Sequence, residues 1–453
     1  MVWRTRFWTR FSPRAGREYD TIHRMLRILA VTLLASLAVQ AQQYDLLLKG
    51  GTVIDARNRI NAVRDVAIKD GKIAAVAAGI PASQALKSVD VSGLYVAPGL
   101  IDIHVHVFAG EGREYMGESS VMPDDHSFRA GVTTMVDAGS SGWKSFPRFK
   151  TRVIDKSHTR VLAFLNIVGT GMGGGSDVEQ NTNEMNPKAC ADRIKQYSSA
   201  IVGVKTAHYT APNWIAVDNG LACANEAGTP LIVDFGKFQP ERPFEDLVTK
   251  KLRPGDIYTH AYLASVPMLD AEGKVRDYLR ESRKRGVLFD VGHGGGSFVF
   301  RQAVPAMQQN FWPDSISTDL HITSMNAGMK DMTNVMSKFL VMGMPMDEVV
   351  ARSTWNPAKE IRREELGHLT VGAVADVAVL SVLTGKFGYT DVYGARLEGD
   401  KKIVAELTLR EGRVVWDLNG LTRQEWNTLP KTYGPQGNGR WDGTLGQAIR
   451  ERR

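Results

Sequence analysis

The feature that most limits how this chain can fold is a run of eight short apolar segments between residues 99 and 360. Helix-forming stretches such as Pro187–Gln196 and Val275–Arg285 separate several of them. Short buried strands that alternate with helices are typical of a parallel sheet, and eight such units favour a closed (β/α)8 barrel over an open sheet. The predicted strands are Leu100–Val105, Thr133–Asp137, Arg160–Ile167, Ile201–Lys205, Pro230–Phe235, Asp256–His260, Val287–Val291 and Ser315–Asp319.

Two β-rich segments flank the predicted barrel. In the first, Asp70-Gly71 separates two apolar stretches, and in the second Glu411-Gly412 does the same, which is a hairpin signal. Neither segment has enough strands to bury a sheet face alone, so we expect the two to pair as one small β-sandwich domain built from both chain ends. The predicted boundaries are 42–98 and 363–430 for the β-sandwich, 99–362 for the barrel and 431–453 for a C-terminal tail.

Residues 1–41 have the features of a secretory signal peptide. The basic start Met25–Arg27 precedes the apolar run Ile28–Val39, and Val39-Gln40-Ala41 matches a small-residue cleavage site. The run is short for a bilayer span, so we expect cleavage, no stable membrane span afterwards, and an exported protein, periplasmic or extracellular. An uncleaved membrane anchor is the alternative, and residues 1–24 are either an upstream extension from a misplaced start codon or a longer basic region.

The net charge of +7 is concentrated at the N-terminus. Seven arginines against one glutamate and one aspartate give residues 1–41 a charge of +5, which leaves +2 for the remainder. A nearly neutral body gives no electrostatic reason to expect nucleic acid as a partner. The only two cysteines, Cys190 and Cys223, form no readable disulfide framework or thiolate metal site. We expect a small-molecule substrate and leave a homo-oligomer open.

Two histidines stand at the end of the first predicted strand, in Ile101-Asp102-Ile103-His104-Val105-His106. The carboxyl ends of barrel strands are where active sites of this fold lie. A spacing of two puts both imidazoles on the same face of a strand, and two neutral imidazoles form half of a divalent-metal site. We therefore predict that His104 and His106 bind a metal, against the alternative of two ordinary polar residues at a barrel mouth.

The fourth predicted strand ends in Lys205. An ammonium would repel a metal ion, and burial beside cations favours the neutral amine. A neutral amine can take up carbon dioxide to form a carbamate, which has the charge of a carboxylate and can bridge two metals. An ordinary ion pair between Lys205 and a carboxylate is the alternative.

Three further strand ends carry polar residues: Asp234 on the fifth strand, His260 on the sixth and Asp319 on the eighth. A carboxylate among apolar neighbours is unfavourable unless it is paired or bound to a metal. Asp319 is the predicted catalytic base, which takes a proton from a metal-activated water and passes it to the leaving group. A structural ion pair is the alternative for both carboxylates.

These motifs together resemble a known family. Pro98 to His106 resembles the opening of amidohydrolase-superfamily barrels, which are TIM-type (β/α)8 barrels, and Lys205, His260 and Asp319 follow in that family's order. Within the superfamily the chain looks most like the dihydroorotase-like and amidohydrolase-deacetylase branch. The segments that carry this closer resemblance are Gly131–Ser140 and Phe289–Phe298.

The resemblance implies two divalent metal ions, usually zinc. His104, His106 and Asp319 would hold one ion, carbamylated Lys205 would bridge to the second, and His260 would bind that second ion. One departure is that the family usually has histidine at the end of strand five, where this chain has Asp234. A carboxylate still binds zinc or manganese but makes the second site more anionic.

The predicted reaction is hydrolysis of an amide, cyclic amide or ester bond by metal-activated hydroxide, for example in an N-acyl amino acid or a dihydroorotase-like substrate. Substrate contacts are predicted at His293, at His208 and at Arg113 in the first loop. His208 is alternatively a substitute metal ligand. Two other functions stay open: a single-metal deaminase, which Lys205 argues against, and a catalytically inactive binding module, which the intact ligand set argues against.

Overall fold

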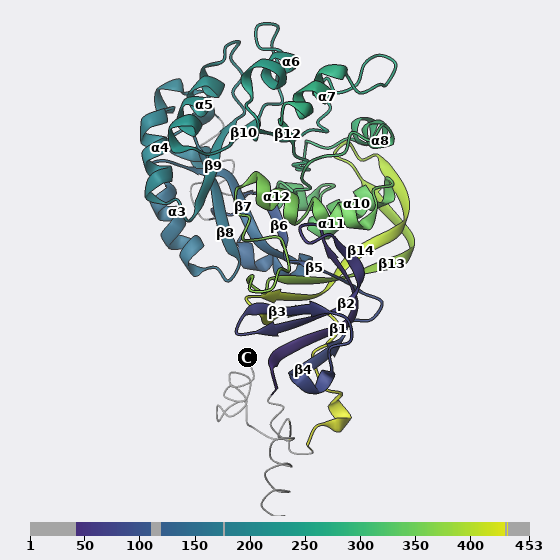
Figure 1. The fold of residues 1–453 in the computed structure, drawn as a ribbon. Coiled ribbons are helices and arrows are strands. Elements are labelled where there is room, and N and C mark those ends of the chain that lie inside the picture. Colours follow the sequence, from purple (N-terminus) through teal and green to yellow (C-terminus); the bar gives the residue numbers. More distant parts are fainter. Residues whose placement is uncertain (1–41, 110–118, 175–176, 431–432, 434–453) are drawn as a thin grey trace, which may run out of the picture.

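The computed structural model describes residues 42–109, 119–174, 177–430 and 433, and these form a large parallel sheet with its helices and a separate smaller sheet (Figure 1). The predicted signal peptide 1–41, Arg113 and all of the predicted tail except Tyr433 lie outside the described residues.

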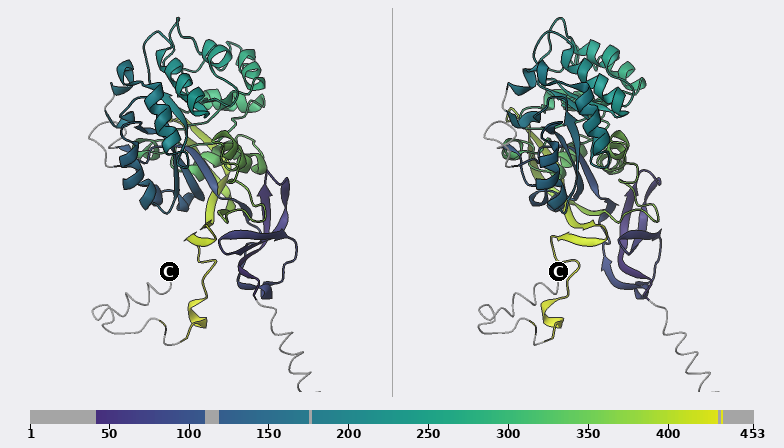
Figure 2. Two further views of the ribbon diagram at one scale, coloured as in Figure 1. Left: turned by 60° about the vertical axis from the view of Figure 1, so that its left-hand side comes forward. Right: turned by 90° about the vertical axis from the view of Figure 1, so that its left-hand side faces the viewer.

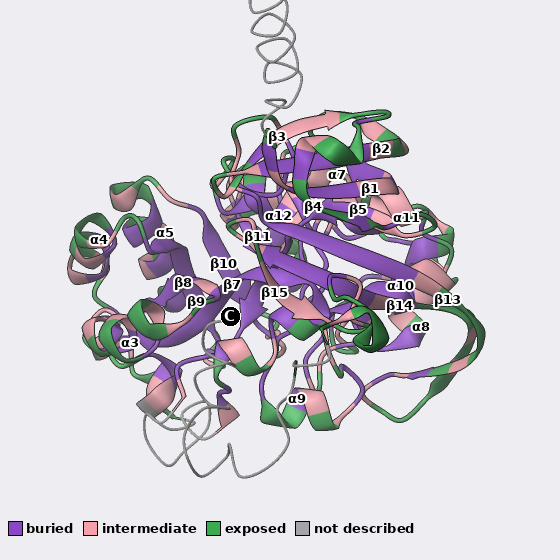
Figure 3. Cartoon of the chain, turned by 90° about the horizontal axis from the view of Figure 1, so that it is seen from below, coloured by how far each residue is buried: buried purple, intermediate pink, exposed green. Residues whose placement is uncertain are grey.

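The larger sheet has seven parallel strands, each paired with the next along the chain. Helices α3, α4 and α5 lie outside the first strands of this sheet (Figure 1). Figure 3 shows that the strands are almost entirely buried, whereas the helices keep an exposed outer face. The strands are β6 (Leu100–Val105), β7 (Val132–Gly142), β8 (Arg160–Asn166), β9 (Ile201–Ala207), β10 (Leu231–Asp234), β11 (Ile257–Tyr258) and β12 (Leu288–Phe289).

The chain returns through α-helices after each of the strands β7 to β12, as the sequence predicts, and the described residues between β6 and β7 include short 3₁₀ turns. The predicted helix 187–196 is confirmed, and the predicted helix 275–285 is present with slightly shorter bounds. The helices are α3 (Phe146–Arg152), α4 (Pro187–Gln196), α5 (Ile215–Ala227), α6 (Phe244–Asp246), α7 (Asp277–Lys284), α8 (Phe300–Gln308), α9 (Ile322–Asn326), α10 (Met332–Val341), α11 (Met346–Ala351) and α12 (Trp355–Glu360), and short 3₁₀ and π turns are η1 (Ala82–Gln84), η2 (Pro123–Asp125), η3 (Phe128–Ala130), η4 (Ile154–Lys156), η5 (Gly171–Gly174), η6 (Val178–Gln180), η7 (Thr182–Glu184), η8 (Leu247–Lys251) and η9 (Trp426–Thr428).

The eighth predicted strand, 315–319, is not a continuous ladder. Residues 315–320 make one parallel bridge at each end: Ser315 pairs with Asp290, and Leu320 pairs with Val105. Asp319 has a φ of 53°, in the left-handed region that is unfavourable for a strand residue. This backbone conformation ends the extended segment at the residue that carries the predicted catalytic base.

The smaller sheet combines strands from both sides of the parallel-sheet segment. Instead of two separate sheets, one hydrogen-bonded sheet runs in the order β15-β14-β13-β5-β1-β2-β3, and β4 pairs with β1 beside this path. One edge of β1 pairs first with β4 and then with β5, and the other edge pairs with β2, with a register shift between Leu48 and Gly51. The strands are β1 (Tyr44–Asp55), β2 (Ile60–Lys69), β3 (Lys72–Ala77), β4 (Ala85–Asp90), β5 (Tyr95–Pro98), β13 (Val377–Thr390), β14 (Arg396–Arg410) and β15 (Arg413–Asp417).

The long hairpin β13–β14 leaves the smaller sheet and runs along the side of the larger one (Figures 1 and 2). At its tip, the amide of Val392 donates to the carbonyl of Phe298 at 3.2 Å, and Asp391 Oδ2 accepts from the amide of Phe300 at 3.2 Å. The hairpin tip therefore touches the segment that follows β12.

Two apolar cores stabilise the parallel sheet. Alternate residues of the strands, such as Ile101, Ile103 and Phe164, form one cluster with α12 on one face. A much larger cluster lies between the other face and the surrounding helices. Each buried aliphatic or aromatic side chain contributes about 1.5–3 kcal/mol, so these clusters fix the strand ends that carry the site. Within the described residues, no helix has both the length and the apolar character that a bilayer crossing requires.

Candidate metal centre

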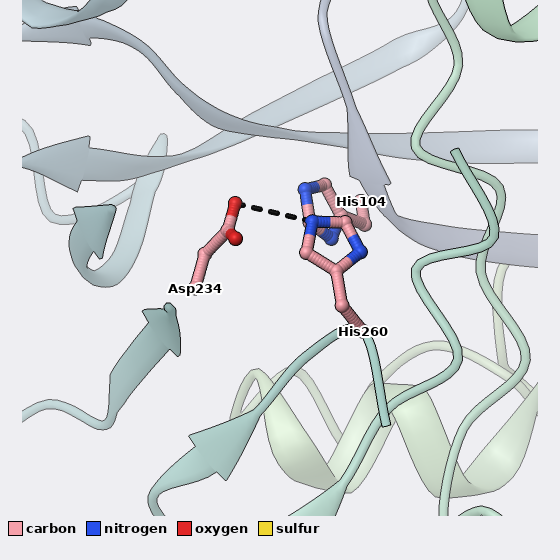
Figure 4. Close-up of side chains that lie close together, drawn as sticks. All are labelled: His104, Asp234 and His260. Atoms are coloured by element: carbon pink, nitrogen blue, oxygen red, sulfur yellow. Dashed lines mark ion pairs between the residues drawn. The ribbon is translucent and has the colours of Figure 1, made fainter. Parts of the chain in front are cut away.

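The strand ends bring the predicted ligands together in two groups that share His104. Ligand atoms of His104, His106 and Asp319 all lie within 4.8 Å of one another, and the same holds for His104, Asp234 and His260. We call these the first and second ligand clusters. All five residues are buried. Figure 4 shows the side chains of the second cluster pointing toward one another, two from the strands β6 and β10 and one from the segment after β11.

In the first ligand cluster a carboxylate oxygen faces two imidazoles. Asp319 Oδ1 lies 3.2 Å from His106 Nε2 and 3.7 Å from His104 Nε2. Among the described residues this buried oxygen has no hydrogen-bond donor. A buried carboxylate oxygen without a donor is unfavourable unless a cation is bound there.

In the second ligand cluster the carboxylate already has a cationic neighbour. Asp234 Oδ2 lies 3.2 Å from His260 Nε2 and 3.1 Å from Lys205 Nζ. The same Nζ is 3.2 Å from His104 Nε2, and the Lys205 side chain is fully buried. Lys205 thus lies between the two clusters, at the place where a bridging group would contact both.

The outer nitrogen of each ligand ring is hydrogen-bonded, which fixes the ring orientation. His104 Nδ1 contacts Thr259 Oγ1 at 2.8 Å, and that hydroxyl donates to Asp290 Oδ2 at 2.7 Å. His106 Nδ1 contacts Ser140 Oγ at 2.8 Å. His260 Nδ1 lies 2.5 Å from the carbonyl oxygen of Gly292.

These outer bonds determine which ring atom is free to bind a cation. Because the carbonyl of Gly292 can only accept, His260 carries a proton on Nδ1, and its Nε2 is the ring atom that faces Asp234 and would bind a cation in place of a proton. Metal-binding histidines in proteins typically have their second nitrogen held in this way. The donor set of imidazole Nε2 atoms and carboxylate oxygens fits a divalent ion such as zinc.

Burial and charge set the protonation states of the first ligand cluster. Burial lowers the pKa of His104 to about 4, and the charge of Lys205 adds to the effect, so the ring is neutral at pH 7. Burial alone would raise the pKa of Asp319, but the imidazoles of His104, His321 and His106 outweigh it and hold that pKa below its usual range. A neutral ring and an ionised carboxylate are the forms that bind a metal.

Strained backbone supports the same site. His208, His260 and Asp319 have φ values of 52°, 62° and 53°, which place them in the left-handed region. Non-glycine residues in this conformation cost of order 1–3 kcal/mol each and concentrate at functional sites. A Cβ on Gly292 would lie 2.7 Å from His260 Nδ1, and one on Gly294 would lie 2.4 Å from Asp319 Oδ2, so both positions require glycine.

A cavity of about 360 Å³, the catalytic cavity, opens on the two clusters. His208, a predicted substrate contact, lies on its wall, with Nδ1 2.6 Å from Glu179 Oε2 and Nε2 3.6 Å from Asp234 Oδ2. Burial alone would lower the pKa of His208, but the negative charges of Asp234 and Glu179 have the larger effect and raise this pKa to about 9. The lining residues are His106, Ser119, His208, Asp234, Gly236, His260, Leu263, Gly295, Gly296, Ser297, Asp319, His321 and Thr323.

His293, the other predicted substrate contact on a described residue, lies elsewhere. It is fully buried outside the cavity lining, with Nε2 2.6 Å from Lys338 Nζ. Arg113, the third predicted contact, lies outside the described residues.

The sequence did not single out several residues that complete the site. His321 lines the cavity with Nε2 3.9 Å from Asp319 Oδ2. Its position two residues after Asp319 was the available signal, because that spacing repeats the one between His104 and His106. Glu179 contacts His208, and Asp290 accepts a hydrogen bond from Thr259. The partners in these pairs are 29 and 31 residues apart, so no local sequence pattern marks either contact.

Comparisons with known proteins agree with this geometry. The chain is 32% identical over 332 residues to a protein named deacetylase from Agrobacterium fabrum, covering 72% of this chain and 80% of that protein. It is 31% identical over 342 residues to a deacetylase from Brucella anthropi, covering 74% of this chain and 83% of the relative. No family model matches the chain.

Solved structures give the same assignment. A structure described as an adenine deaminase has a TM-score of 0.75 and 28% identity, covering 83% of this chain and 100% of that one. A dihydroorotase structure has a TM-score of 0.72 and 28% identity, covering 82% of this chain and 99% of that one. With two His–Asp ligand clusters at the strand ends, these likenesses confirm the resemblance seen in the sequence: the chain belongs to the amidohydrolase superfamily, as a metal-dependent hydrolase of carbon–nitrogen bonds other than peptide bonds.

Proposed function

We propose that this protein hydrolyses a small amide or cyclic amide, such as an N-acyl amino acid, with two divalent metal ions. The observation that carries the proposal is the pair of ligand clusters that share His104, with Lys205 Nζ between them. His104, His106 and Asp319 would hold one ion, and Lys205, Asp234 and His260 the other. When bound, the ions polarise the substrate carbonyl and lower the pKa of a water molecule.

Asp319 is the proposed base. Its carboxylate stays ionised at neutral pH because its pKa lies below the usual range, and it lines the catalytic cavity. It would take a proton from the attacking water and deliver it to the leaving nitrogen.

Lys205 is the proposed bridging group, as a carbamate. Its neutral amine would form a bond to the carbon of carbon dioxide and lose one proton, which leaves a carbamate with one negative charge. The fully buried Nζ, within 3.2 Å of one residue from each cluster, supports this role.

The identity of the metals follows from the donor atoms. The first cluster has two imidazoles and one carboxylate, a set that suits zinc. The second has Asp234 where related barrels usually have histidine, and oxygen donors shift preference toward manganese. We therefore propose zinc in the first cluster and zinc or manganese in the second.

We also propose that residues 315–320 complete a closed (β/α)8 barrel. The parallel bridges to Asp290 at one end and Val105 at the other support closure, because they join the two edges of the seven-stranded sheet through this segment. Export remains a proposal that rests on the signal-like residues 25–41; N-terminal sequencing of secreted protein should then begin at Gln42.

Deamination is the second candidate function, favoured by the likeness to a structure described as an adenine deaminase. Ammonia release from adenine would support it, whereas hydrolysis of N-acetyl amino acids, hydantoin or dihydroorotate would support the leading proposal.

One experiment tests the proposal directly. Metal analysis of the purified protein should find about two ions per chain, and the substrate panel should show turnover that a chelator removes. Protein that binds no metal, or that hydrolyses the panel equally well after metal removal, would contradict it.

A further inference from the structure

A buried lysine behind the catalytic cavity has no part in the proposed chemistry. Lys338, in α10, is fully buried, and its ammonium has three hydrogen-bond partners. They are His293 Nε2 at 2.6 Å, the carbonyl of Gly328 at 2.7 Å and the carbonyl of Thr390 at 2.8 Å. An ammonium has three N–H donors, so these acceptors satisfy it completely.

The partners come from three different parts of the chain. His293 follows β12, Gly328 lies between α9 and α10, and Thr390 ends β13 at the tip of the hairpin. Burial lowers the pKa of Lys338 to about 7, which shows that this location is unfavourable for a charge. A lysine retained in such a place needs a structural or functional reason.

His293 links Lys338 to the segment that lines the site. Its Nε2 accepts from Lys338, so its proton is on Nδ1, which donates to the carbonyl of Gly294 at 3.0 Å. The ring also stacks on Phe298, with 4.4 Å between centroids. Both ring nitrogens are therefore engaged within the protein, and His293 does not line the catalytic cavity.

The segment that His293 holds is part of the cavity wall. Gly294 donates its amide to the carbonyl of Thr318 at 2.9 Å and has no room for a Cβ against Asp319 Oδ2. Gly295, Gly296 and Ser297 then line the catalytic cavity. Glycine-rich backbone is conformationally free, so its position depends on its end anchors.

The other end of this segment is anchored by the hairpin. Val392, at the tip, donates to the carbonyl of Phe298, one residue beyond Ser297. Lys338 binds the same tip through Thr390. One ammonium thus connects both anchors of the segment.

We propose that Lys338 is a positioning residue that holds segment 294–297 against Asp319, through His293 at one end and the β13–β14 tip at the other. This inference rests on the proposed function only in identifying Asp319 as the group that must be held in place. It predicts that Lys338 strengthens the coupling between the smaller sheet's hairpin and the cavity wall, beyond the direct contact of Val392 with Phe298.

The test compares Lys338→Met with Lys330→Met, because Lys330 is an exposed lysine just before the same helix. In Lys338→Met, hydrogen exchange should lose protection in peptides covering both 293–298 and 390–395. On the panel substrate that wild type turns over fastest, kcat should fall by about 10–100-fold. KM should change much less, because Lys338 does not line the cavity, and metal content should match wild type. Lys330→Met should match wild type in every measurement.

A second variant guards against a folding defect. His293→Phe keeps the ring stacked on Phe298 and leaves Lys338 its two carbonyl partners, so only peptides covering 293–298 should lose protection. Exchange rates and kcat within twofold of wild type in both variants would overturn the proposal. Hydrogen exchange needs no substrate, so wild type that hydrolyses nothing in the panel would refute the proposed function while the exchange data still decide the role of Lys338.

Discussion

The two ligand clusters share His104 but differ in how their carboxylates are balanced. In the first, Asp319 faces imidazoles, and its Oδ1 has no hydrogen-bond donor among the described residues. In the second, Asp234 contacts the Lys205 amine at 3.1 Å, so a positive group already stands beside it. The first cluster is therefore prepared for a cation, whereas the second must first lose the charge of Lys205.

This difference implies that modification and metal binding are coupled in the second cluster. A carbamate on Lys205 would put a second negative group beside Asp234, and like charges at this distance repel strongly in a buried site. A bound cation would offset that repulsion. We therefore expect the first cluster to fill before the second, and the second only when carbon dioxide is available.

The largest expected effect is on the first cluster's carboxylate. Asp319→Asn should lower kcat by about 10²–10⁴-fold, because the amide cannot take up the proton. Metal content should stay largely intact, since the imidazoles and the other cluster remain. Steady-state kinetics and elemental analysis check this. Turnover at the wild-type rate would remove Asp319 from the proposed role.

The second largest effect concerns the stability of the metal-free protein, because the carboxylates of the two clusters have different charged neighbours. Asp234→Asn leaves the buried Lys205 ammonium without its counter-charge, so we expect the unfolding free energy of metal-free protein to fall by about 3–5 kcal/mol. Asp319→Asn is the matched control, and it should cost less because the ion-pair partners of Asp319 among the described residues are imidazoles, which can lose their protons, and not a lysine. Urea titrations in chelator measure both. Equal losses in the two variants would show that the charge difference does not exist.

Much of this site was predictable because strand geometry is local. The spacing of His104 and His106 puts two rings on one strand, and parallel strands end at the same edge of a sheet, so Lys205, Asp234, His260 and Asp319 could be expected beside them. The smaller sheet was also visible from its hairpin turns at Asp70-Gly71 and Glu411-Gly412, where all four φ values are positive.

The contacts that orient the ligands were not predictable. Thr259 and His104 are 155 residues apart, and Ser140 and His106 are 34 apart, so no local pattern marks either pair. Likewise, nothing in the sequence indicates that His293 contacts Lys338, which lies 45 residues away in α10. Strand position indicates which residues reach the edge of a sheet but not which helix residues bind them there.

A smaller effect should distinguish the clusters through these ring contacts. Thr259→Val removes the hydroxyl between His104 and Asp290. His104 would bind the first ion, and its Nε2 lies 3.2 Å from Lys205 of the second ion's ligand set, so metal affinity at both clusters should fall by about 10–100-fold. Ser140→Ala releases only His106, so it should weaken the first cluster alone. Chelator competition on the two variants measures this. Identical losses would mean that His104 does not serve both clusters.

The smallest expected effect is a loss of folding stability at alkaline pH, and it comes from His208 beside the second cluster. The folded-state pKa of His208 is raised to about 9, against about 6.5 for an unperturbed histidine, mainly by Asp234 and Glu179 once the opposing effect of burial is overcome. A group whose pKa is raised on folding binds its proton more tightly in the folded state. Its stabilisation is therefore complete below pH 6.5 and is lost as the pH rises toward 9.

Metal-free protein should accordingly lose stability between pH 6.5 and 9, and His208→Asn should flatten that slope. Urea titrations in chelator at several pH values in this range give the slope for both proteins. In metal-loaded protein the slope should be shallower even with His208 present, because a cation bound by Asp234 takes over the charge that raises the pKa of His208. An unchanged slope on metal binding would place the cation away from Asp234, and the contrast between the two clusters would then have to be explained without a second ion.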